Sequence, residues 1–167
     1  MEFVDVVRRR RSIRKYRPEK VSDEKLVNMF EAVRLAPSGS NRQSWRFIIV
    51  RDKGKKVKLA EVCNRQLWLR DADMIVVGCW LPCEGVDDMR LRRDVTIALE
   101  HLVLAAANEG LGSCWIGAFD EEAVKSVLDI PQEVGVSNLI SIGYSAEEPQ
   151  PRMVKSLEEI ICYDSFK

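Results

Sequence analysis

Apolar side chains recur at helical spacing in several separate stretches of the chain. After Ser22 they follow one another three and four positions apart until Pro37, which predicts a helix with Ser22 as its N-cap. The same spacing is most regular over residues 94–108. Shorter amphipathic runs predict further helices near residues 3–7, 57–62 and 120–128.

Continuous apolar and β-branched runs alternate with these helices and predict strands at residues 45–50, 74–79, 114–116 and 136–142. Residues 12–16, just before Pro18, are expected to be extended. The chain contains no internal repeat, low-complexity tract or linker. We therefore expect a single domain over residues 1–167, of the α/β or α+β class.

The composition describes an ordinary globular protein, with 46% hydrophobic and 31% charged residues in a chain of 167. The longest apolar stretch, residues 74–83, is shorter than the ~20 residues of a membrane-spanning helix. The first residues place acids and apolar side chains before the arginines, which is the reverse of a secretory signal. We expect a cytoplasmic protein with no membrane partner.

The cysteines and the single histidine do not predict a metal site. Cys79 and Cys83 are separated by three residues rather than two, and no second pair of cysteines or histidines completes a set of ligands. His101 lies within an apolar helical stretch, which is more typical of a core or interface residue than of a catalytic one.

Charge is divided unevenly along the chain, although its total is zero. Residues 1–83 contain 19 basic and 10 acidic side chains, whereas residues 84–167 contain 7 and 16. The basic half therefore either binds an anion or faces the acidic half, in the fold or in an oligomer.

Arginines are densest between residues 8 and 17, in the sequence RRRRSIRKYR. Arginine forks and a serine hydroxyl are typical of a phosphate pocket, but the same cluster fits a nucleic-acid patch or a solvated helix end. Arg152 is an isolated basic residue in the acidic half, and a solvated surface charge explains it equally well.

Two loops carry small and amide residues that can approach a ligand. The first, PSGSNRQSW at residues 37–45, either presents amides to a heteroaromatic ligand or forms an ordinary turn around Asn41. The second, GLGSCWIGA at residues 110–118, combines glycines with the large surface of Trp115, or simply ends a helix and begins a core strand. Neither contains a dinucleotide-binding or P-loop motif.

Four stretches in this order resemble the nitroreductase family of FMN-dependent flavoproteins: RRSIRKY, APSGSNRQSWRF, IALEHLVLAAANEGLGSCWIGAFD and GYSAEEPQPRMVKSLEEII. The resemblance covers nearly the whole chain. It implies a three-layer, nitroreductase-like α+β fold, in which helices flank a mixed, mainly antiparallel sheet. It also implies a homodimer that binds two FMN molecules at its interface. The activity implied is ping-pong hydride transfer from NADH or NADPH through flavin N5 to an electron-poor acceptor, such as a nitroaromatic or quinone.

The resemblance also assigns roles to individual residues. The phosphate and ribityl binders implied are Arg10, Arg11, Ser12 and Arg14, with Arg152 closing the phosphate site from the C-terminal side. The loop that reaches the flavin from the partner subunit comprises Pro37, Ser38, Gly39 and Asn41. Gln66 would contact the pyrimidine edge, and Ile116 and Gly117 would lie under the isoalloxazine, with the Gly117 amide near N5. No catalytic acid or base and no metal is implied.

Two departures from the family pattern leave other functions open. Ser44 stands where the family usually has proline, and the compact chain leaves only residues 82–93 as a candidate lid. A flavin-binding carrier or sensor without turnover is one alternative. A specialised chemistry, such as reductive dehalogenation, flavin fragmentation or ring reduction, is another, and a nucleic-acid binder is a third.

Overall fold

The computed structural model describes residues 2–150 and 153–166, so Arg152 lies outside the described residues. The helices, in chain order, are α1 (Phe3–Arg9), α2 (Asp23–Arg34), α3 (Lys53–Val62), α4 (Asp88–Asn108) and α5 (Glu121–Leu128). The strands are β1 (Trp45–Val50), β2 (Met74–Trp80), β3 (Gly112–Ile116) and β4 (Gly135–Gly143). Two short 3-10 turns are η1 (Gly39–Asn41) and η2 (Leu67–Asp71).

The four strands form one sheet in the order β1-β2-β4-β3, and each neighbouring pair is antiparallel. Parallel pairing is found at an isolated bridge between Ser12 and Ser113, beside β3. The expected sheet was mixed, whereas the strands themselves are antiparallel throughout. The extended segment over residues 12–16 is confirmed, with a second bridge joining Tyr16 to Ser145.

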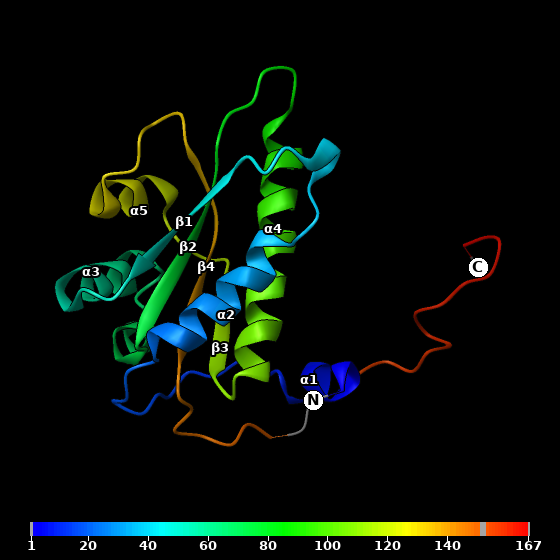
Figure 1. Ribbon diagram of the computed structural model, residues 1–167, viewed down its shortest axis with the longest axis horizontal. Coiled ribbons are helices and arrows are strands. Elements are labelled where there is room, and N and C mark those ends of the chain that lie inside the picture. Colours follow the sequence, from blue (N-terminus) through cyan, green and yellow to red (C-terminus); the bar gives the residue numbers. More distant parts are fainter. Residues whose placement is uncertain (1, 151–152, 167) are drawn as a thin grey trace.

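Helices cover both faces of the sheet, which gives the three layers that were expected (Figure 1). Helices α2 and α4 pack together on one face, and α3 and α5 lie on the other. All seven residues of β2 are buried, because this central strand has helices on both sides.

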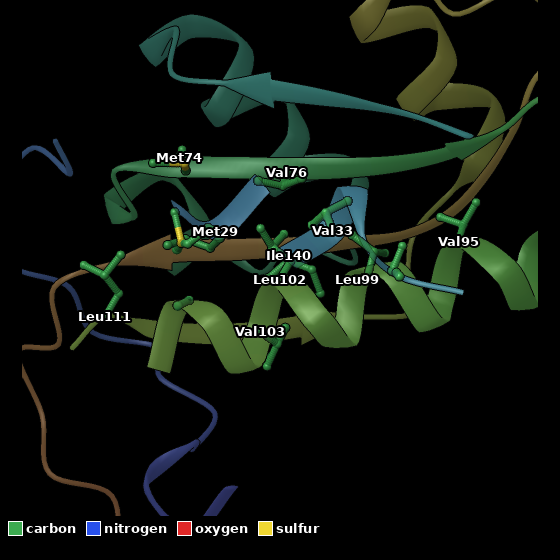
Figure 2. Packing of buried hydrophobic residues seen from close by; sticks show 14 of the residues in the cluster. Met29, Val33, Met74, Val76, Val95, Leu99, Leu102, Val103, Leu111 and Ile140 are labelled. Carbon is green, nitrogen blue, oxygen red and sulfur yellow. The ribbon is translucent and has the colours of Figure 1, made fainter. Parts of the chain in front are cut away.

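The core under α4 is built from aliphatic side chains of four elements (Figure 2). Leu99 and Leu102 of α4 meet Met29 of α2, Val76 of β2 and Ile140 of β4, and all five are fully buried. A second cluster fills the space between the sheet and α3 and α5. Together these clusters hold the sheet and its helices in fixed positions, and this frame supports the candidate site.

Side-chain caps explain where four of the helices begin, including α3, which Asp52 caps. Ser22 Oγ accepts a hydrogen bond from the Lys25 amide at 3.3 Å, which confirms the predicted N-cap. Asp120 caps α5 in the same way. Asp87 caps α4, so this helix begins at Asp88, six residues earlier than predicted. The second half of the candidate lid over residues 82–93 is therefore helix, and its role as a lid stays a prediction.

Apolar side chains remain exposed at both ends of the chain. Phe3, Val4 and Val7 of α1 are exposed, and so is every described residue of the segment 153–166. This segment, the C-terminal tail, runs away from the sheet and its helices (Figure 1). Among residues 2–150 and 153–166, no helix has the length and apolar character needed to cross a membrane.

Candidate functional site

The basic N-terminal segment lies alongside strand β3. The Ile13 amide donates to the Ser113 carbonyl at 2.9 Å, and the Arg17 amide donates to the Tyr144 carbonyl at 2.9 Å. These backbone contacts fix an extended conformation, in which successive side chains point to opposite sides. The segment therefore presents two different faces.

Arg10 and Ser12 face one cavity, while Arg11 and Ile13 face another. We call the first the Trp115 cavity; its volume is about 430 Å³, and its lining residues are Val7, Arg10, Ser12, Glu100, Leu104 and Trp115. The structure thus brings Arg10 and Ser12 together with Trp115 and separates Arg11 from them.

Arg11 contacts the C-terminal part of the chain instead. Its guanidinium donates hydrogen bonds to the carbonyl oxygens of Pro149 and Gln150. The cavity beside it is also lined by Arg8, Arg9, Glu147 and Glu148. Arg11 is therefore placed to fix the chain just before the C-terminal tail.

Trp115 is held by a carboxylate from helix α4. Its indole Nε1 donates to Glu100 Oε2 at 3.2 Å, and both residues are partly buried. Glu100 is the acidic side chain that lines the Trp115 cavity, and this hydrogen bond uses one of its oxygens. One cavity therefore combines a guanidinium, a hydroxyl, a carboxylate and an aromatic surface.

Several of the predicted site residues act on the Cys114 thiol of strand β3. Burial raises the pKa of the Cys114 thiol, while the positive charge of Arg14, a hydrogen bond with Ser12 and the charge of Arg10 act in the opposite direction. The Ser12 hydroxyl therefore contacts this buried position of β3, and the charges of Arg14 and Arg10 act on it.

Arg14 also extends toward the turn η2. Its guanidinium carbon is 5.9 Å from the centre of the Trp68 ring, and its backbone amide donates to Glu147 Oε1 at 2.6 Å. Gln66 immediately precedes η2, two residues before Trp68. Gln66 therefore stands next to the turn whose Trp68 ring the Arg14 guanidinium approaches.

The end of β3 exposes backbone rather than side chain. The Ile116 side chain is buried in the core between the sheet and α3 and α5, whereas Gly117 is exposed. A methyl group at Gly117 would lie 3.5 Å from Asn138 Nδ2. Asn138 is half-buried on β4, and its Oδ1 accepts a hydrogen bond from Ser137 Oγ at 3.1 Å. Asn138 was not predicted, because an amide within a strand gives no distinct sequence signal.

The loop of Pro37, Ser38, Gly39 and Asn41 lies elsewhere, next to the N-terminal half of α4 (Figure 1). The Gly39 amide donates to Asp94 Oδ2 at 3.1 Å, whereas the Trp115 cavity is lined by Leu104 of the same helix. Ten residues of helix correspond to about 15 Å. The loop therefore does not line the Trp115 cavity of its own chain.

The surface of α4 between these two places is only partly covered. Ile97, His101 and Leu104 are neither fully buried nor fully exposed. His101 Nδ1 lies 2.9 Å from the Ile97 carbonyl oxygen, within the same helix. His101 thus belongs to a helix surface and not to the central core.

Comparison with known proteins identifies the family. The model of the nitroreductase family matches residues 7–80 and 65–144, which together span most of the chain. A protein of Archaeoglobus fulgidus named for NADH dehydrogenase and NAD(P)H nitroreductase activities is 35% identical over 153 residues, covering 88% of this chain and 87% of its own.

Solved structures agree with this assignment. The FMN-dependent nitroreductase of Clostridium difficile R20291 is 30% identical, with a TM-score of 0.88 over 98% of this chain and 99% of its own. A nitroreductase family protein from Clostridium novyi NT is 31% identical, with a TM-score of 0.84 over 88% and 87% of the two chains. The chain belongs to the nitroreductase family, and its α+β fold is that of the family. The protein is an oxidoreductase of the nitroreductase type.

Proposed function

We propose that this protein is an FMN-dependent NAD(P)H oxidoreductase that acts as a homodimer, with each flavin held by residues of both subunits. The observation that carries the proposal is that the expected binding residues lie at two separate places along α4. The Trp115 cavity lies toward one end of this helix, and the loop of residues 37–41 lies toward the other. A second copy facing the uncovered surface of α4 would bring a loop to each cavity.

The residues of the Trp115 cavity fit the chemistry of FMN. Arg10 provides positive charge for a phosphate and Ser12 provides a hydroxyl, while Trp115 and Leu104 provide apolar surface for a flat ring. Arg14 does not line the cavity, but its positive charge acts on the neighbouring Cys114. Arg11 is engaged with the C-terminal segment, so we place Arg10, Ser12 and Arg14 in the phosphate site and keep Arg152 as its C-terminal member.

Bound FMN would supply hydride chemistry at N5, taking hydride from NADH or NADPH and passing it in a second step to an electron-poor acceptor, such as a nitroaromatic or a quinone. The residues of the chain bind and orient. Arg10 and Arg14 would form charge-assisted hydrogen bonds with the phosphate, worth about 1.5–3 kcal/mol each. Glu100 fixes the Trp115 ring, and Gly117 exposes backbone at the end of β3. The chain's own side chains need supply no acid or base.

One observation favours a second candidate, a flavin-binding carrier or sensor. Because α4 begins at Asp88, the loop that precedes it is short, and much of the candidate lid is helix. A short loop leaves little of the chain to enclose an acceptor beside the flavin, which favours a protein that binds flavin without general turnover. Turnover therefore has to be measured separately from binding.

The visible spectrum of the purified protein tests the function. Flavin absorption bands that disappear with NADH or NADPH and return with a quinone are the expected result. Bands that persist with both nicotinamides would favour the carrier. A colourless protein that FMN does not reconstitute would refute the proposal.

Mixed dimers test the shared site. Arg10→Ala damages the cavity and Asn41→Ala damages the loop, and each variant alone should lose most of its FMN. A heterodimer of the two contains one site without either substitution, so mixing them should restore flavin to one site per dimer. If mixing restores nothing while heterodimers form, both parts of the site belong to one chain.

A further inference from the structure

Helix α4 carries a carboxylate in an apolar surrounding. Asp94 lies among buried residues such as Val95 and Ala98, and its side chain is only 7% exposed. A buried carboxylate is costly unless it is paired and hydrogen-bonded. Its partners therefore indicate why an acidic residue stands at this position.

Both partners of Asp94 belong to the loop that follows α2. The Gly39 amide donates to Asp94 Oδ2 at 3.1 Å, and Arg42 Nη2 donates to the same oxygen at 3.4 Å. The Arg42 side chain is itself mostly buried, with 21% exposure. One carboxylate oxygen thus joins two points of the loop to the central helix.

The loop has an unfavourable backbone around these two points. Ser40, Asn41 and Gln43 have φ angles of 52°, 54° and 53°, in the left-handed region that residues other than glycine rarely adopt. Each such residue is strained and persists only where the surroundings enforce it. The Ser38 hydroxyl, which accepts from the Gln43 amide at 3.0 Å, enforces part of this conformation.

Arg42 and Gly39 are fitted to each other as well. A side chain at Gly39 would overlap the Arg42 guanidinium, so glycine at this position allows the guanidinium to lie against the backbone and reach Asp94. The carboxylate, the guanidinium and the glycine therefore form one unit, which we call the Asp94 anchor (Asp94, Gly39 and Arg42).

We infer that Asp94 is a positioning residue of the site: through the Asp94 anchor it sets the conformation in which Asn41 and its neighbours are presented to the flavin of the partner subunit. The inference rests on the proposed function. Asp94 itself touches no ligand and acts through the loop. The same helix holds Trp115 through Glu100, six residues further on.

Asp94→Asn tests the inference, because it removes the charge and keeps the size of the side chain. We expect FMN to bind about tenfold or more weakly in flavin-fluorescence titrations of the apoprotein, as for the loss of a charged hydrogen bond. Arg42→Met should have a similar effect. Asp88→Asn is the matched control, since it changes an exposed carboxylate in the first turn of the same helix and should bind FMN like the parent.

Mixed dimers separate a positioning role from a general loss of stability. Asp94→Asn should regain flavin when it is paired with Arg10→Ala, and should fail to do so when paired with Asn41→Ala, because the latter pair leaves a damaged loop at both sites. Parent-like FMN binding by both Asp94→Asn and Arg42→Met would overturn the inference, and so would rescue by Asn41→Ala.

Tryptic cleavage after Arg42 distinguishes failure of the inference about Asp94 from failure of the proposed function. It needs no flavin, and we expect it to be several-fold faster in Asp94→Asn apoprotein than in the parent or in Asp88→Asn. If the parent binds no FMN, the proposed function fails, and with it the role at the flavin. If the parent binds FMN and cleavage is unchanged in Asp94→Asn, the inference alone fails.

Discussion

The core beneath α4 and the C-terminal tail contain the same kinds of side chain in opposite surroundings. Leu99, Leu102 and Ile140 are fully buried, whereas Met153 and Phe166 are fully exposed. At ~25 cal/mol per Å², burial makes the first set a main source of stability, and the second contributes nothing to its own subunit. The core is therefore complete within one chain, and the tail is not.

Helix α1 stands between these two extremes. Val6 is buried against the rest of the molecule, while Phe3, Val4 and Val7 on the same helix are exposed. Exposed apolar side chains at both ends of the chain are typical of surfaces that contact another protein. The proposed homodimer gives these residues a place to be buried.

Leu102→Ala should reduce stability more than Tyr16→Phe or removal of the C-terminal tail. The substitution leaves a cavity in a closely packed core, and we expect the free energy of unfolding to fall by about 2–5 kcal/mol. Urea denaturation followed by circular dichroism measures the change. Val27→Ala, on the exposed side of α2, is the control and should stay within about 0.5 kcal/mol of the parent. Equal effects of the two would contradict the described core.

Tyr16→Phe should have an intermediate effect. The buried hydroxyl donates to the Ile13 carbonyl at 2.7 Å and lies 2.7 Å from Ser141 Oγ, so its removal should cost about 1 kcal/mol. Burial raises the pKa of Tyr16 well above its ordinary value, despite a hydrogen bond from Ser141 that lowers it.

This raised pKa makes Tyr16 a source of instability in alkali. Below a pH of about 10, both the folded and the unfolded chain keep the phenol proton, and the contribution of Tyr16 is complete. Above that pH the unfolded chain releases the proton while the folded chain retains it, so stability falls as pH rises. Unfolding free energies measured between neutral pH and alkali should decline less steeply in Tyr16→Phe. An identical slope would show that the phenol ionises freely in the folded protein.

Removal of residues 153–167 should have the smallest effect on the fold of the subunit. Every described residue of the tail is exposed, so the shortened chain should keep the circular dichroism of the parent. The dimer of the shortened chain should dissociate at a higher protein concentration than the parent dimer, as measured by sedimentation velocity. A shortened chain that fails to fold would show that the tail belongs to the subunit's own core, and unchanged dissociation would remove it from the interface.

Much of the fold could be predicted from hydrophobic periodicity. The cap at Ser22 and the strands β1 and β2 follow from local patterns that tertiary contacts reinforce. The first turns of α4 were missed, because residues such as Met89 are exposed there and the amphipathic pattern begins only where the helix meets the core. The extra turn η2 follows from packing rather than from a repeating pattern.

The candidate site was less predictable, because contacts between distant segments decide which of its residues come together. Nothing in a run of arginines shows that Arg10 and Arg11 face different cavities; the pairing of the next residue, Ser12, with β3 decides this. Asp94 did give a signal, an acid at the start of the most regular apolar stretch. Its meaning depended on Arg42, some fifty positions earlier in the chain.

The arrangement along α4 also constrains how the sequence can change over time. Asp94 holds the loop and Glu100 holds Trp115, so the two attachment points are separated by a fixed number of residues on one rigid helix. Inserting one residue between them would turn one point by about 100° relative to the other and shift it by about 1.5 Å. We therefore expect a one-residue insertion or deletion between Asp94 and Glu100 to misplace either the loop or Trp115, whereas a substitution at the exposed Arg92 or Arg93, just before this stretch, should disturb neither.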